Sequence, residues 1–419
     1  MNKINCFRNR YSRKVIADIF IFTHLLSTLN SSGSYPPTLT RTKTMIRHSF
    51  EIPLTDSVKS FIPTTDSPTP DSYTAVSVDF LKRYSHINKI WDDNPLLLEH
   101  NISIVKCLHS YEDINLKIRS HLIKKDIKIT NAFMKMYEWL LYMSKYFKNY
   151  DSIKHFDIAS APGTFVLASD CYFGNRNIKY NWYASSAKDG DLQDYYGLFR
   201  NNKKNYRNCD VCVEEDLRSM IKYHQGKYDL VTGDIGKKSS GYETLQEYQC
   251  LNEQYGQARL AMDLCKHGGV CFLKMFTITC AESMWLVDVM RLYFDKVSIV
   301  KPYTSRFMNA ECYIMAVGRN SVECTLPLLR PNVVGYRSDN ADLYNEIEEI
   351  RYAEKIDMLD EIIRCLSENG FDAEKLKQSE VFNKYFEKLQ LLYDLFTLKI
   401  QDKDLAESLM WNPVRRQDD

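Results

Sequence analysis

The hydrophobic positions of the chain follow two periods, and each period predicts a different kind of element. Short apolar runs bounded by Gly, Pro, Asn or Asp predict buried strands, and apolar residues recurring every 3.6 positions predict helices. Strands are predicted in this way at residues 155–159, 178–184, 209–213, 227–233, 270–276, 297–301 and 312–318. Helical patterns alternate with them, including a long one from Glu243 to His267 that Gly268-Gly269 would cap. This alternation predicts an α/β fold with a doubly wound, mostly parallel sheet.

The pattern also divides the chain into regions. Residues 1–72 are rich in Ser, Thr and Pro, which predicts a poorly ordered arm. Its apolar run Val15–Leu29 is interrupted by Asp18 and His24, so a signal peptide or membrane anchor is the less favoured interpretation, and the start at Met1 or Met45 is open. Residues 73–129 predict a helical lead-in and residues 130–320 the α/β domain.

Residues 321–419 predict a helical C-terminal region. An amphipathic helix runs from about Leu343 and ends at Asn369-Gly370, and a second helix covers about 380–399. Such a helical hairpin either packs on the core or serves a protein partner or RNA. Packing is favoured, because amphipathic helices usually bury their apolar stripe against their own domain.

Composition changes this picture in two respects. The net charge is +1, so any nucleic-acid site must be a local basic patch. Leu116–Lys128 and Arg200–Arg207 are such segments, and each is either a phosphate contact or a solvated face. The 12 cysteines are scattered, which favours free thiols in a reducing compartment. Cys209 and Cys212 have zinc-like spacing, but no second ligand pair completes the site, so no metal is predicted.

Candidate chemistry lies at the ends of the predicted strands. The first strand ends in Ser160-Ala161-Pro162-Gly163, a turn that opens a helix and lets backbone approach a ligand at the glycine. The glycine patterns of nicotinamide sites, phosphate loops and nucleophile elbows are absent. Ionisable residues are present instead, and a lysine within an apolar strand needs charged partners. They are Asp234 after the fourth strand, Lys274 on the fifth, Glu311 before the seventh, and Lys135 on the helix that precedes the first.

These stretches resemble, in chain order, the motifs of one enzyme family. Asp157–Phe165, Tyr228–Asp234, Gly268–Lys274 and Lys301–Glu311 are similar to motifs of the FtsJ/RrmJ family of S-adenosylmethionine-dependent ribose 2′-O-methyltransferases. Four other stretches resemble the Adrift-type subgroup of this family: Thr130–Glu138, Trp182–Ser186, Asp194–Gly197 and Tyr255–Gln257. This subgroup includes animal cap-2 methyltransferases and methyltransferase-like proteins of asfarviruses, and the viral proteins are the closer match. The resemblance covers residues 105–320 and implies a Rossmann-like, seven-stranded sheet with an antiparallel last strand.

The resemblance also implies roles for single residues. The catalytic residues would be Lys135, Asp234, Lys274 and Glu311, with Lys274 as a general base whose pKa is depressed by burial and by the neighbouring lysine. The cofactor S-adenosyl-L-methionine would contact Ser160, Ala161, Pro162, Gly163, Asp234 and, at its adenine, Asp216. Family members often carry an acidic residue after the second strand, where this chain has Tyr183–Ser186. Recognition of the cofactor ribose is therefore unassigned, although Asp189 and Asp191 are nearby.

The implied function is methylation of ribose in RNA, acting on the cap-proximal nucleotides of mRNA. The alternatives are the same chemistry on internal or ribosomal RNA, or a non-catalytic RNA-binding subunit with this fold. The latter is disfavoured because a scaffold has no use for two buried lysines. We expect a cytoplasmic protein (a host cytoplasm or virus factory for a viral one), with RNA as partner, no stable membrane association, and the C-terminal helices as the place for any protein partner.

Overall fold

The computed structural model describes residues 46–61, 63, 90, 93–99, 130–188, 194, 196–236, 246–306, 309–369, 372–379 and 382–383. The chain divides into two compact units, residues 1–40 and 41–419, and all described residues belong to the second. Its strands are β1 (Ile46–Glu51), β2 (Ser152–Ile158), β3 (Lys179–Ser186), β4 (Tyr206–Asn208), β5 (Tyr228–Gly233), β6 (Cys265–Met275), β7 (Phe294–Pro302) and β8 (Cys312–Arg319).

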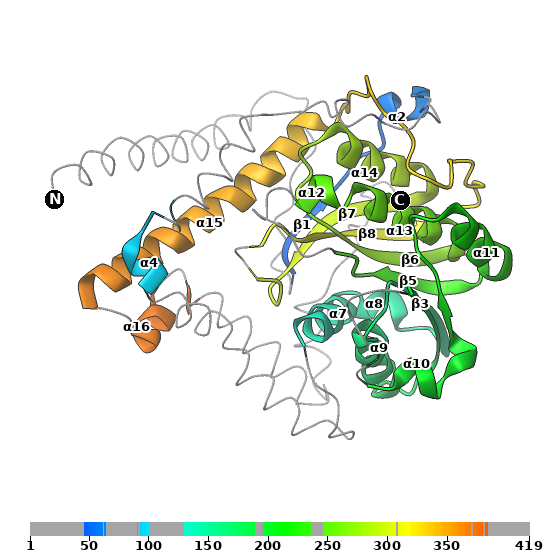
Figure 1. Cartoon of the computed structure of the whole chain (residues 1–419), viewed down its shortest axis with the longest axis horizontal. Helices are drawn as coiled ribbons and strands as arrows, with labels where there is room; N and C mark the ends of the chain where they lie inside the picture. The colour runs from blue at the N-terminus through cyan, green and yellow to red at the C-terminus, as the bar shows by residue number, and fades with distance from the viewer. Residues whose placement is uncertain are drawn as a thin grey trace, which may run out of the picture. The chain divides into compact units, whose positions relative to one another are not determined.

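The helices precede, separate and follow these strands (Figure 1). They are α2 (Asp56–Ser60), α4 (Pro95–Glu99), α7 (Asn131–Tyr142), α8 (Ser144–Phe147), α9 (Thr164–Gly174), α10 (Leu198–Asn201), the 3₁₀ turn η2 (Lys203–Asn205), α11 (Glu214–His224), α12 (Gln246–Gln249), α13 (Leu251–Leu264), α14 (Ala281–Tyr293), α15 (Ala341–Asn369) and α16 (Ala373–Gln378). The Leu116–Lys128 segment, most of the lead-in and most of residues 380–399 lie outside the described residues.

All eight strands form one sheet, with the order β1-β7-β8-β6-β5-β2-β3-β4. Strands β2 to β7 run parallel, while β8 is antiparallel to β6 and β7 and β1 is antiparallel to β7. The chain first moves outward from β2 to β4 and then crosses to β5 on the other side of β2. This reversal places a topological switch point, where α/β sheets bind ligands, at the carboxyl ends of β2 and β5. The predicted doubly wound sheet and its antiparallel last strand are confirmed.

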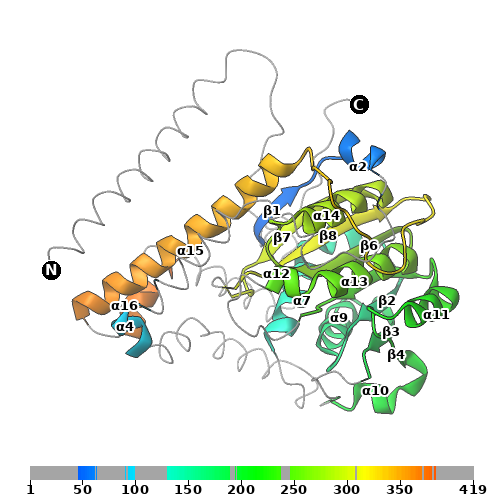
Figure 2. The ribbon, with the colours of Figure 1, turned by 45° about the horizontal axis from the view of Figure 1, so that its top comes forward.

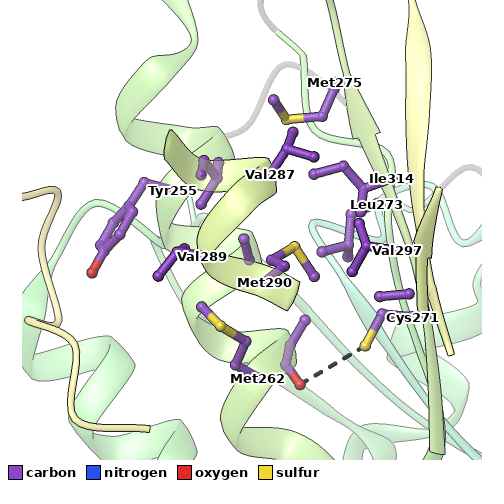
Figure 3. Close-up of a cluster of buried hydrophobic side chains, with 14 of the residues drawn as sticks. Tyr255, Met262, Cys271, Leu273, Met275, Val287, Val289, Met290, Val297 and Ile314 are labelled. Carbon is purple, nitrogen blue, oxygen red and sulfur yellow. Dashed lines mark hydrogen bonds between the residues drawn. The ribbon is translucent and has the colours of Figure 1, made fainter. Parts of the chain in front are cut away.

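Helices cover both faces of the sheet because side chains alternate between faces along each strand. On β6, Phe272 faces the cluster that contains α7 and α9, whereas Cys271 and Leu273 face the cluster that contains α11, α13 and α14. Figure 3 shows the second cluster, where Met290 of α14 lies against side chains of β6, β7 and β8. The central strands are apolar on both faces, as buried parallel strands require.

Two strands differ from the sequence prediction. The predicted arm over residues 1–72 contains β1, which adds an eighth strand by pairing with β7 from Ile46↔Pro302 to Glu51↔Ser298. The predicted strand at 209–213 is wrong: β4 comes just before it, and the side chain of Asp210 accepts the N–H of Cys212 at 2.9 Å. An Asp that binds the backbone two residues on makes a turn and ends the ladder.

The predicted helix over residues 243–267 is also wrong in its extent. Two helices, α12 and α13, take its place, and α13 ends at Leu264. Gly268 and Gly269 lie within β6 instead of capping a helix, at a point where the register with β5 shifts between Tyr228 and Leu230. Glycines mark bulges as well as helix ends, and the pattern alone does not separate the two.

The predicted amphipathic C-terminal helix is α15. Its first half contributes Tyr344 and Ile347 to the cluster with α13 and α14, and its second half packs with Leu97 of α4 and Leu376 of α16 (Figure 2). Within the described residues, the first half of α15 therefore packs on the core and its second half packs with α4 and α16. No helix within the described ranges is both long and apolar enough to cross a membrane.

Phe272 at the centre of β6 is expected to be a major source of stability. Its ring stacks on Trp139 of α7 at 4.6 Å and on Tyr313 of β8 at 4.3 Å, and all three are fully buried. Phe272→Ala should lower the free energy of unfolding by about 3–5 kcal/mol, measured by denaturant titration. The control Tyr223→Ala removes an aromatic ring that is 48% exposed and should cost far less. Equal losses would contradict this assignment.

Candidate active site

Four charged side chains from four elements meet at the carboxyl edge of the sheet. Lys135 comes from α7, Lys274 from β6, Asp234 follows β5, and Glu311 precedes β8. Thr130 fixes the start of α7, because its hydroxyl accepts the N–H of Phe133 at 3.3 Å, as an N-cap does. The sequence named all four residues, and the structure brings them together.

The four groups form one cluster of ion pairs. Lys135 Nζ lies 3.0 and 2.9 Å from the carboxylate oxygens of Glu311 and 3.7 Å from Asp234 Oδ2. Lys274 Nζ lies 3.3 Å from Glu311 Oε2 and 3.5 Å from Asp234 Oδ1. Two lysines and two carboxylates make the cluster neutral when all are ionised. Removing one member leaves an uncompensated buried charge, which typically costs about 3–5 kcal/mol.

The cluster has a deep side and an open side. The side chains of Lys135 and Glu311 are 8% and 6% exposed, whereas those of Lys274 and Asp234 are 14% and 22% exposed. Gly236 borders the open side, where a Cβ atom would lie 3.0 Å from Lys274 Nζ. A ligand can therefore reach the lysine of β6 and the aspartate of β5, while the deeper pair holds them in place.

The predicted depressed pKa of Lys274 is wrong. Burial works to lower the pKa, but the carboxylates of Asp234 and Glu311 outweigh it and raise the pKa above the usual lysine value. Glu311 shows the complementary effect: burial opposes ionisation, and Lys135, Lys274 and Lys301 hold its pKa below the usual range. Glu311 therefore contributes stability above the normal glutamate pKa, and that contribution is lost as the pH falls through the depressed value.

Residues that the sequence prediction missed support the cluster. Tyr313 donates its hydroxyl to Asp234 Oδ1 at 2.8 Å, and Ser305 donates to Glu311 Oε1 at 2.7 Å. Tyr313 lies two residues after Glu311, and Ser305 lies within the Lys301–Glu311 motif, so their positions were the available signal. Both are fully buried. Together they limit the carboxylates to few orientations.

A second polar network holds the turn after β2. Asp157 accepts the hydroxyls of Ser160 at 2.5 Å and of Thr232 at 2.6 Å, and Thr232 also bonds to His155 Nε2. Burial raises the pKa of Asp157 to about 7 and lowers that of His155 to about 3, so the histidine is neutral. The network ties the turn to β5, the strand that carries Asp234.

The turn itself is also fixed to β3. The Ser160 N–H donates to the carbonyl of Ser185 at 2.8 Å, and the Ala161 N–H donates to Ser186 Oγ at 2.8 Å. Gly163 has φ +96°, which favours glycine, and α9 begins directly after it. The predicted cofactor turn thus lies at the switch point, beside the ion-pair cluster.

The sequence predicts that a ligand approaches the backbone at Gly163, but two side chains of α10 lie against this residue. A Cβ atom there would come within 2.5 Å of Leu198 Cδ2 and 3.3 Å of Phe199 Cζ, so these side chains use the space that glycine leaves. Asp216 Oδ2 accepts the N–H of Asp210 at 2.8 Å, which shows that it fixes the loop after β4. Asp210 follows that strand more directly, and sequence reasoning overlooked it. Asp189 and Asp191 lie outside the described residues.

The chain is similar in sequence to known methyltransferases. Residues 129–319 match the family model of FtsJ-like methyltransferases. This part of the chain is an FtsJ-like methyltransferase domain. A probable methyltransferase of African swine fever virus is 31% identical over 222 residues, which are 48% of this chain and 51% of the viral protein. This chain therefore spans about half the length of the viral relative that it matches.

More distant relatives include animal enzymes. A cap-specific mRNA (nucleoside-2′-O-)-methyltransferase of Drosophila melanogaster is 25% identical over 49% of this chain and 33% of its own length. A related enzyme of Caenorhabditis briggsae is 33% identical over 39% of this chain and 20% of its own length. Among solved structures, a Plasmodium falciparum protein described as a ribosomal RNA methyltransferase covers 44% of this chain and 96% of its own, with 15% identity and a TM-score of 0.33.

Gly163 of the FtsJ-like domain offers a test of the turn. Gly163→Ala should lower both the midpoint of thermal unfolding and the affinity for S-adenosylmethionine, because the new Cβ strains the backbone and overlaps Leu198. Gly226→Ala is the control, since Gly226 has φ +63° but nothing within 4 Å of a Cβ. Calorimetry that finds equal affinity in both variants would contradict the turn's role.

Proposed function

We propose that this protein is an S-adenosylmethionine-dependent RNA ribose 2′-O-methyltransferase acting on the cap-proximal nucleotides of mRNA. The observation that carries the proposal is the neutral cluster of Lys135, Asp234, Lys274 and Glu311 beside the switch point of an FtsJ-like domain. The names of the Drosophila and Caenorhabditis relatives support the choice of capped mRNA.

The residues at the switch point fit this cofactor. The first turn of α9 offers backbone N–H groups and a helix N-terminus to its carboxylate. Asp210 and Asp216, in the loop after β4 and the first turn of α11, are the acidic candidates for its adenine amino group. Asp234 and the Ser160–Gly163 turn follow the neighbouring strands β5 and β2 at this edge of the sheet. When bound, the cofactor supplies a methyl group activated by a sulfonium.

The cluster then has to prepare a ribose hydroxyl. A C–O bond forms and a C–S bond breaks while the hydroxyl proton leaves, so the oxygen must be held in line and deprotonated. Lys274 and Asp234 form the open side and would contact the hydroxyl, whereas Lys135 and Glu311 orient them through the ion pairs of the cluster. Lys274 is the proposed base. Its raised pKa means that the reactive neutral form is a small fraction at neutral pH.

The experiment that tests the proposal compares RNA substrates. The full-length protein is incubated with methyl-labelled cofactor and transcripts that are capped, uncapped, or capped and already 2′-O-methylated at the first or second nucleotide. The expected result is that only capped RNA is labelled. Loss of the label when the first or the second nucleotide is already methylated identifies the nucleotide that the protein methylates. Equal labelling of uncapped RNA would point to internal sites, and no labelling with intact cofactor binding would sink the proposal.

The pH dependence of the rate tests the role of Lys274. Because the pKa of this lysine is raised, the neutral fraction should grow about tenfold per pH unit, with no plateau below the ordinary lysine value of about 10.4. Lys274→Arg keeps the charge but cannot lose its proton, so it should be inactive. Single-turnover rates measure the pH dependence and the activity of Lys274→Arg. The control is Lys296→Ala, which replaces a partly exposed lysine of β7.

Two results would contradict the assignment of Lys274 as the general base. A rate independent of pH, or near-normal turnover in Lys274→Arg, would mean that this lysine only supplies charge. If the lysines act as a unit, Lys135→Ala/Lys274→Ala should be scarcely slower than either single variant.

The exposed basic segment from Arg200 to Arg207 provides a separate prediction about RNA. Lys203 and Lys204 are exposed in η2, at the β3–β4 edge of the domain. Charge reversal of both should flatten the fall of log affinity for RNA with log salt, because each phosphate contact releases counterions. Reversing Lys154 and Lys179, exposed near the amino ends of β2 and β3, should leave the slope unchanged. Equal slopes in both double variants would mean that the segment is only a solvated face.

A further inference from the structure

The helix α15 lies outside the residues that match the family, yet it reaches the neighbourhood of the cluster. Glu348 and Arg351 lie one turn apart on it, with side chains 1% and 3% exposed, and Arg351 Nη1 donates to Glu348 Oε1. A buried ion pair is costly unless its remaining donors and acceptors are satisfied. The hydrogen-bond partners of these remaining donors and acceptors indicate the role of the pair.

The ion pair bridges the two segments that carry catalytic residues. Glu348 Oε1 accepts the N–H of Ile278 at 3.2 Å, in the segment that follows Lys274 and β6. Arg351 Nη2 donates to the carbonyl oxygen of Ala310 at 2.6 Å and to that of Glu311 at 3.3 Å. One pair on α15 thus fixes the backbone on both sides of the cluster.

Glu311 depends on this backbone more than the other members do. Its carbonyl oxygen also accepts Lys301 Nζ at 2.6 Å, while its carboxylate spans Lys135 and Lys274. Both lysines are within 3.3 Å of Glu311 Oε2, so a small backbone shift breaks one contact or the other. Charge-assisted bonds to the carbonyls resist such a shift.

We propose that Arg351, oriented by Glu348, is a positioning residue for Glu311, so that methyl transfer by the FtsJ-like domain depends on a helix outside it. The inference rests on the proposed function. Arg351 contacts backbone next to the cluster and none of the proposed reacting groups, so it acts through Glu311.

The test compares variants of the full-length protein in single-turnover methyl transfer to capped RNA. Arg351→Met should lower the rate at least about tenfold, with dissociation constants for cofactor and RNA within about twofold of the parent. Arg351→Lys should recover part of the rate, because it keeps the charge with fewer donors. The control is Arg364→Met on the same helix, where the side chain is 42% exposed and paired with Glu361 and Glu368; its rate should be unchanged.

A double variant separates positioning from general support. If Arg351 acts through Glu311, adding Arg351→Met to Glu311→Gln should slow the reaction no further. If the double variant instead loses rate by the product of the two single effects, the proposal is overturned. A parent-like rate in Arg351→Met would also overturn it, as would a loss of cofactor affinity that accounts for the whole effect.

The parent protein tests the proposed function independently. If it binds cofactor but methylates no RNA, that function fails, and thermal unfolding decides the positioning role. Midpoint shifts of Arg351→Met and Glu311→Gln should then be non-additive, because coupled residues share an interaction, while Arg364→Met and Glu311→Gln should add. Additive shifts for both pairs would refute the coupling.

Discussion

The balance of charge among two lysines and two carboxylates governs how this site is built. Each of the four needs its partners at this depth, because an uncompensated buried charge costs about 3–5 kcal/mol, which is a large part of a protein's stability. The fold therefore delivers them together: α7 is capped at Thr130, β5 ends at Asp234, β6 carries Lys274, and β8 begins just after Glu311. The stacked rings of Trp139, Phe272 and Tyr313 lock α7, β6 and β8 to one another.

Charge balance also explains why the site does not favour a neutral lysine. The carboxylates that make burial of Lys274 tolerable are the same groups that raise its pKa. Any base chemistry at this lysine must therefore use the small neutral fraction that these two carboxylates leave.

The sequence was sufficient to predict the sheet and the four clustered residues, because strand ends and motif order are local features. It could not predict properties that depend on tertiary distance. The sign of the Lys274 pKa shift follows from carboxylates that lie far away in the chain. The turn at Asp210 and the bulge at Gly268 were missed because side-chain-to-backbone bonds and glycines have several local solutions. The hydrogen bond from Arg351 to the carbonyl of Ala310 was missed because nothing in an amphipathic helix pattern shows which carbonyl an arginine will meet.

The pairing of β1 with β7 has a consequence for how the chain folds as it is made. Ile46 belongs to β1, which is synthesised before the other described strands, yet its partner Pro302 ends β7, which is completed only after β2 to β6. During synthesis from the ribosome, this strand has no neighbour to pair with until most of the domain has emerged. The edge formed by β1 and β7 can join the rest of the sheet only through β8, which pairs with both β6 and β7 and is made after them. Contacts so distant in the chain close slowly, so this edge should set the pace of the final folding step.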